Sequence, residues 1–81
     1  MNELHGFEQA SVSVDARKLK CPMPLLKLKQ ALNALTIGDS VHLVVTDRTA
    51  LRDFQSFIGV TQHTMTITEH ESEIHFYIVK G

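Results

Sequence analysis

The sequence predicts an α/β protein, namely a two-layer α/β sandwich of the order βαβαββ, with a four-stranded mixed sheet and two helices on one face. Two stretches with apolar residues at helical spacing alternate with strand-like stretches, and a pair of strand-like stretches ends the chain. Two helices can cover only one face of such a sheet, so the other face should carry polar side chains. Alternate positions of the strand-like stretches supply them, in Ser11, Ser13, Thr64, Thr66, Thr68, His75 and Tyr77.

The first strand and helix follow a short N-terminal segment. Residues 1–9 lack periodicity and are expected to form a flexible extension to a single domain of residues 10–81. Residues 11–14 alternate with period two, as in a strand with one apolar face. A helix is then expected from Pro22, because leucines recur on one face and Gly38 with Asp39 ends the pattern. Its apolar stripe consists of Leu25, Leu28, Leu32 and Leu35.

The remaining elements complete the order. Residues 41–45 are an almost continuous apolar run, which is typical of a central strand, and one helix separates them from the first strand. The two strands should therefore be parallel with a right-handed crossover. Residues 49–58 are expected to form the second helix, because Leu51, Phe54 and Ile58 recur at helical spacing. Asp47 or Thr49 is expected to cap this helix. Residues 64–68 and 74–78 alternate on either side of a polar turn, which predicts a terminal hairpin.

The only cysteine stands where the first helix begins, in Lys20-Cys21-Pro22-Met23-Pro24. Proline is tolerated in the first turn of a helix, so the two prolines place the helix start here and Cys21 at the N-cap. This position lies just past the end of the first strand, where open α/β sheets usually carry their sites. A lone cysteine is most often a small buried apolar residue, but that role requires no proline on each side of Met23. We interpret Cys21 as a reactive thiol.

Three features are expected to stabilise the Cys21 thiolate. Amides of the first turn, such as that of Met23, would donate hydrogen bonds, and the helix dipole is positive at this end. Pro22 and Pro24 fix this turn, and Lys20 adds a charge beside it. Five basic residues and no acidic one lie between positions 16 and 38, namely Arg17, Lys18, Lys20, Lys27 and Lys29. Together these features predict a thiol pKa roughly one to two pH units below its ordinary value of about 8.5.

Composition excludes several functions. The 81 residues carry a net charge of −1 and no long apolar run or signal sequence, so we expect a cytoplasmic protein that does not enter membranes. Most acidic residues lie in the second half, which argues against stable nucleic-acid binding. The sequence has no glycine-rich phosphate loop and no Ser-His-Asp grouping. The five histidines lack the spacing of metal ligands, so neither a metal nor a cofactor is expected; they are His5, His42, His63, His70 and His75.

The Cys-Pro-Met-Pro segment resembles the signature of the TusA family of sulfur carriers, also called SirA-like. The resemblance covers roughly residues 11–81, including Thr46-Asp47, Arg52-Asp53 and the ending Ile78-Val79-Lys80-Gly81. The family usually has glycine where Lys18 stands and proline where Arg48 stands. Its fold is a βαβαββ sandwich, in agreement with the order of elements given above.

The resemblance implies a sulfur relay. Cys21 would receive sulfane sulfur as a persulfide from a cysteine desulfurase or another sulfurtransferase and pass it to a downstream acceptor protein. The best-known member of the family feeds 2-thiolation of the wobble uridine of tRNA. We therefore expect a monomeric carrier rather than a stand-alone enzyme. The residues expected to bind its partners are Arg17, Lys18, Lys20, Asp47 and Arg48.

The residues themselves favour a relay and leave two alternatives open. With one cysteine, the chain cannot release sulfur by closing its own disulfide, so a nucleophile on another molecule must remove it. A thiol redox sensor would also use an exposed cysteine of low pKa. A small RNA- or protein-binding module without sulfur transfer would use the open sheet face, on which His75 and Tyr77 are expected.

Overall fold

A computed structural model of the protein describes residues 10–81. The order of its elements is β1 (Val12–Ala16), α1 (Met23–Asn33), β2 (Ser40–Val45), α2 (Thr49–Gly59), β3 (Thr64–His70) and β4 (Glu73–Val79). The predicted βαβαββ order is confirmed. The expectation for residues 1–9 lies outside the described residues. No helix in the described part of the chain is long and apolar enough to span a bilayer.

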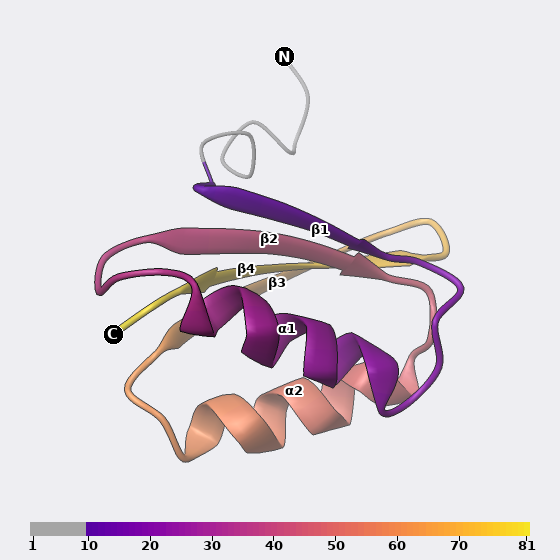
Figure 1. Ribbon diagram of the computed structural model, residues 1–81. Helices are drawn as coiled ribbons and strands as arrows, with labels where there is room; N and C mark the ends of the chain where they lie inside the picture. Colours follow the sequence, from indigo (N-terminus) through magenta and orange to yellow (C-terminus); the bar gives the residue numbers. More distant parts are fainter. Residues whose placement is uncertain (1–9) are drawn as a thin grey trace.

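The four strands form one mixed sheet in the order β1-β2-β4-β3. Strands β1 and β2 are parallel, whereas β4 runs antiparallel to both β2 and β3. The nearly continuous apolar run of β2 is central, as predicted, because β2 lies between β1 and β4. Figure 1 shows both helices on the same face of the sheet. The predicted two-layer sandwich is therefore confirmed.

The core lies between the helices and the sheet. Leu28 and Leu32 of α1 and Phe54 of α2 are buried in one cluster with Phe76 of β4. The rings of Phe54 and Phe76 have centroids 4.3 Å apart, a common separation for packed aromatic pairs. Leu35 is also buried, but Leu25 is only half-buried at the margin of the core. The buried side chains of α1 are Pro24, Leu28 and Leu32, so the helix packs on the sheet along its length.

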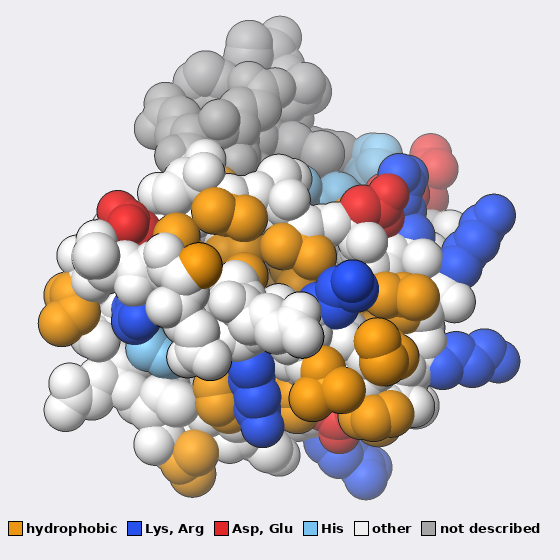
Figure 2. All heavy atoms as spheres, in the orientation of Figure 1, with side chains coloured by type: hydrophobic (Ala, Val, Ile, Leu, Met, Phe, Trp, Pro, Cys, Tyr) orange, Lys and Arg blue, Asp and Glu red, His pale blue; other side chains and the backbone are white. Residues whose placement is uncertain are grey.

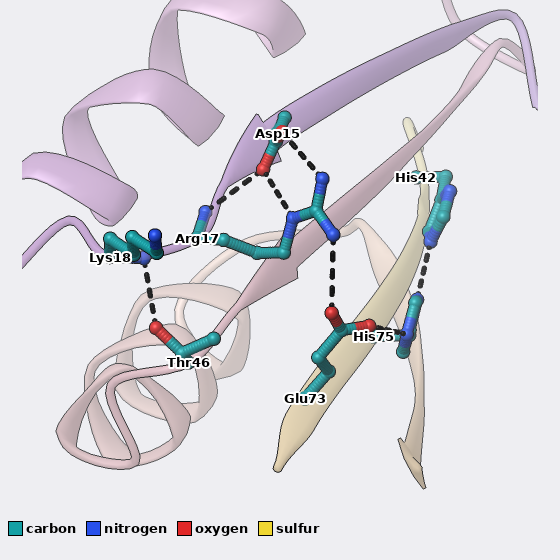
Figure 3. Close-up of polar contacts among 7 residues, drawn as sticks. All are labelled: Asp15, Arg17, Lys18, His42, Thr46, Glu73 and His75. Carbon is teal, nitrogen blue, oxygen red and sulfur yellow. Dashed lines mark hydrogen bonds and ion pairs between the residues drawn. The ribbon is translucent and has the colours of Figure 1, made fainter. Parts of the chain in front are cut away.

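One prediction about the open face is wrong. His75 is predicted to be one of the solvent-exposed polar side chains on the face that the helices leave open, but it is only 5% exposed. Its Nδ1 lies 2.8 Å from Nε2 of His42, and its Nε2 lies 3.2 Å from Oε1 of Glu73 (Figure 3). The two imidazole rings are also stacked, with centroids 5.1 Å apart. Because both ring nitrogens of His75 have polar neighbours, the side chain tolerates burial.

The C-terminus holds the end of α1 in place. The Lys80 ammonium donates hydrogen bonds of 2.7 Å to the carbonyl oxygens of both Leu32 and Leu35. The last carbonyls of a helix have no partner inside it and form the negative end of its dipole, so a cation is stabilising there. The backbone of Lys80 also pairs with Gly38 and Asp39, each at 2.8 Å. Lys80 thus joins the last residues of the chain to the helix that Cys21 precedes.

We expect Lys80→Met to lower the free energy of unfolding by about 1.5–3 kcal/mol, because two hydrogen bonds from a charged group are lost. Urea denaturation followed by circular dichroism would measure the change. Lys27→Met is the matched control, since Lys27 lies in the first half of α1 rather than at its end. An equal loss of stability in both variants would contradict this capping role.

Candidate functional site

Cys21 lies at the edge of the sheet where the parallel strands end. Strands β1 and β2 both point toward this side, and α1 and α2 both begin there, on the right in Figure 1. Cys21 is in the turn between β1 and α1, and its side chain is exposed. The expected position past the end of the first strand is confirmed.

The start of α1 differs from the prediction by one residue. The N-cap is Pro22, not Cys21, and the helix begins at Met23. The Met23 amide donates to the carbonyl of Lys20 at 2.8 Å, which closes a turn around Cys21. This amide is therefore not available to the thiol, and the expected N-cap position of Cys21 is wrong.

Two carboxylates from the second half of the chain surround Cys21. Its Sγ donates a hydrogen bond to Oδ2 of Asp53 at 3.0 Å, and its amide donates to Oδ2 of Asp47 at 3.3 Å. Oδ1 of Asp47 accepts bonds from the amide and the hydroxyl of Thr49, at 3.0 and 2.8 Å. The N-cap of α2 is Arg48, so the prediction of Asp47 or Thr49 as the cap is wrong, although Asp47 contacts the first residue of the helix and also holds the backbone of Cys21.

These carboxylates reverse the expected acidity of the thiol. The hydrogen bond to Asp53, then desolvation, and then the negative charges of Asp53 and Asp47 raise the pKa of Cys21 above its ordinary value. The prediction of a lowered pKa is therefore wrong. That prediction rests on the basic residues close to Cys21 in sequence, whereas the carboxylates that act on the thiol, Asp47 and Asp53, lie 26 and 32 positions later in the chain.

We therefore expect the rate of Cys21 alkylation by iodoacetamide to inflect at a higher pH than that of free cysteine, since the thiolate is the reactive form. Rates measured across a pH series would show the inflection. The same chain unfolded in urea is the control, because unfolding separates Cys21 from Asp53. An inflection in the folded protein at or below that of the unfolded chain would contradict this expectation.

Arg17 does not contribute its charge to the thiol. Its guanidinium bonds to Asp15, with Nε and one terminal nitrogen both at 2.9 Å, and to Glu73 at 3.2 Å (Figure 3). The bond to Arg17 lowers the pKa of Asp15 to about 2. This network also contains the Glu73 carboxylate that contacts His75. Arg17 therefore joins β1 to β4 through ion pairs, although it is one of the predicted partner-binding residues.

The backbone explains both departures from the family pattern. Lys18 has φ of 68°, in the left-handed region where glycine is favoured, and its amide donates to Oγ1 of Thr46 at 2.8 Å (Figure 3). Arg48 has φ of −67°, a value that proline also adopts. As an arginine, this residue adds two contacts with Glu69, at 3.1 and 3.3 Å. The backbone thus accommodates either residue at both positions.

A shallow groove extends from Cys21 along the first turns of α2. Its lining residues are Cys21, Arg48, Thr49, Leu51, Arg52, Asp53 and Gln55. Met23 and Leu26 of α1 are 43% and 44% exposed, and Figure 2 shows apolar side chains among Lys and Arg on the side where both helices begin. Lys18 and Lys20 are exposed as well. The sequence predicts Arg52 and Asp53 only as part of the second helix and of the family resemblance, and it gives no signal for their place at the thiol.

These features define a class of protein: a small α/β sandwich that presents one accessible thiol beside a groove, with no second cysteine in the chain. The family model for the sulfurtransferase TusA matches residues 12–80, and the chain belongs to the TusA family.

Similar proteins agree with this assignment. The sulfur carrier protein TusA of Allochromatium vinosum is 35% identical over 69 residues, which cover 84% of this chain and 91% of that protein. A putative sulfur carrier protein of Neisseria meningitidis serogroup A is 31% identical over 70 residues, covering 86% of this chain and 95% of the relative. The crystal structure of a SirA-like protein from Desulfitobacterium hafniense superposes with a TM-score of 0.79 at 25% identity, covering 86% of this chain and 97% of that one.

Proposed function

We propose that this protein is a sulfur carrier whose Cys21 accepts sulfane sulfur as a persulfide and passes it to a downstream acceptor protein. The donor is a cysteine desulfurase or another sulfurtransferase. The observation that carries the proposal is an exposed thiol at one end of an open groove, in a chain without a second cysteine. A persulfide on Cys21 therefore requires a nucleophile from another molecule for its release.

The surroundings of Cys21 support exchange between proteins. A carrier of this family interacts with both a sulfur donor and a sulfur acceptor, so its thiol must reach the reactive groups of two different proteins. The turn between β1 and α1 projects Cys21 from the edge of the sheet, and the groove along α2 leaves room beside it for a partner's loop. The exposed Lys18 and Lys20 flank this turn and favour partners with acidic rims.

The proposal also includes the pathway that uses the transferred sulfur. We propose 2-thiolation of tRNA as one end use, with the carrier acting as a cytoplasmic monomer that contacts proteins rather than holding RNA. The alternative of a redox sensor is less well supported than the sequence suggested, because a sensor requires a readily ionised thiol and the two carboxylates oppose ionisation of Cys21.

Intact-mass spectrometry tests the proposal. The protein is incubated with cysteine and a desulfurase of the same cell, and one added sulfur atom per chain is expected. Dithiothreitol should remove this sulfur, because it reduces persulfides. A protein that gains no sulfur from any desulfurase or sulfurtransferase of that cell would contradict the relay.

A further inference from the structure

Asp53 is held against the thiol by a rigid element. It lies on α2, directly before Phe54, which is fully buried against Phe76. Ala50, one turn earlier, is also buried. These contacts fix the helix on the sheet, so the half-buried Asp53 side chain is directed at Cys21 from packed structure rather than from a loop.

The contact creates a chemical requirement. A thiolate, not a thiol, attacks sulfur, but the hydrogen bond from Sγ to Asp53 favours the protonated thiol at rest. The proton must therefore leave Sγ as the new bond forms. Oδ2 of Asp53 lies 3.0 Å from Sγ, within the reach of about 2.6–3.2 Å that a general base needs.

We infer that Asp53 is a catalytic residue for the sulfur transfer proposed above, accepting the proton of Cys21 during attack and returning it to the leaving thiolate. Sγ bonds to the terminal sulfur of the donor's persulfide, and the sulfur–sulfur bond of the donor breaks. The proton passes from Sγ to Oδ2 of Asp53 and then to the departing donor sulfur. The products are the Cys21 persulfide and the donor thiol, with no net change of charge or oxidation state.

This role predicts opposite effects on two reactions of one thiol. Alkylation by a small neutral reagent depends on the fraction of thiolate, which Asp53 reduces. Transfer from a protein donor depends on moving the proton within the complex, which Asp53 promotes. A carboxylate that only raised the pKa of the thiol would slow both reactions, so its removal would speed both.

Asp53→Asn removes the base and the charge but keeps the size and one acceptor oxygen. We expect the inflection of the alkylation rate to move to lower pH and alkylation at neutral pH to become faster. The rate of sulfur loading by the desulfurase should fall about tenfold or more, as for loss of a general base. Glu71→Gln is the matched control, because it also changes one carboxylate to an amide, in the exposed turn between β3 and β4.

Several results would overturn the inference. Loading of Asp53→Asn at the wild-type rate, or a loading rate that rises together with alkylation, would show that Asp53 gives no help to transfer. A loss of loading with an unaltered alkylation profile would show that the carboxylate does not act on the thiol proton. The urea denaturation midpoint and the alkylation profile of Asp53→Asn also show whether the variant is folded, so these outcomes can be distinguished from misfolding. If the wild type itself takes up no sulfur, the proposed function fails and this inference fails with it.

Discussion

Replacement of Cys21 by serine is expected to abolish sulfur loading completely, while leaving the fold intact. A serine hydroxyl is a far weaker nucleophile toward sulfur than a thiolate, and no other residue of this chain can hold a persulfide because Cys21 is the only cysteine. Cys21 is exposed and outside the core, and a serine hydroxyl can still donate to Asp53. Intact-mass spectrometry would measure loading, and urea denaturation should give the wild-type midpoint.

The same variant separates the proposed relay from its alternatives. Full cellular function of Cys21→Ser would favour an RNA- or protein-binding module, since binding through the sheet needs no thiol. Reaction of the wild-type thiol with physiological peroxide, without any reaction with a desulfurase, would favour a redox sensor. Loss of cellular function in the serine variant would exclude the binding module, and sulfur loading of the wild-type thiol without reaction with peroxide would then favour the relay over the sensor.

The fold followed from local patterns in the sequence. Helical spacing of Leu28 and Leu32 placed α1, and the apolar run of residues 41–45 identified the central strand β2. The boundaries were less predictable, because pairing across the sheet extends strands through polar residues. The polar turn of the hairpin was expected over residues 69–73, but Glu73 pairs with His70, which leaves only Glu71 and Ser72 between β3 and β4.

The site was predictable in position but not in its electrostatics. Cys21 and its prolines form a short contiguous motif, so the turn that carries the thiol could be found from sequence alone. Asp53 is predicted only as part of the second helix, because nothing local in the sequence relates it to a residue 32 positions away. Arg17 is paired both with Asp15, two positions before it, and with Glu73, 56 positions after it, and only the first of these pairs is local in sequence. A count of charges along the sequence therefore missed the acidic Asp53 beside the thiol and wrongly assigned the positive charge of Arg17 to it.

The structure also divides the basic cluster into two groups. Arg17 is engaged with Asp15 and Glu73, whereas Lys18 and Lys20 are exposed in the segment between β1 and α1 that carries Cys21. The carboxylates of Asp53 and Asp47, rather than the lysines, determine the shift in the pKa of Cys21. We therefore propose that the charges of Lys18 and Lys20 serve the recognition of partners, so that reversing them tests docking and not thiol chemistry.

We expect Lys18→Glu combined with Lys20→Glu to slow sulfur transfer to and from protein partners about tenfold or more at low salt, because charged rims steer association by such factors. The loss should shrink as salt rises, since exposed charges are screened over about 8 Å at physiological ionic strength. Alkylation by neutral iodoacetamide should change little. The backbone bond from Lys18 to Thr46 does not involve the altered side chain, so the turn should persist.

Single variants give the matched comparison for this effect. Lys20→Glu reverses a charge next to Cys21, whereas Lys29→Glu reverses an exposed one farther along α1. Transfer rates from a desulfurase, measured over a salt series for both variants, should fall more steeply for Lys20→Glu at low salt. An equal drop of transfer and alkylation at every salt concentration would mean that the lysines act on the thiol, and the docking surface would then have to lie elsewhere, with the groove along α2 the next surface to alter.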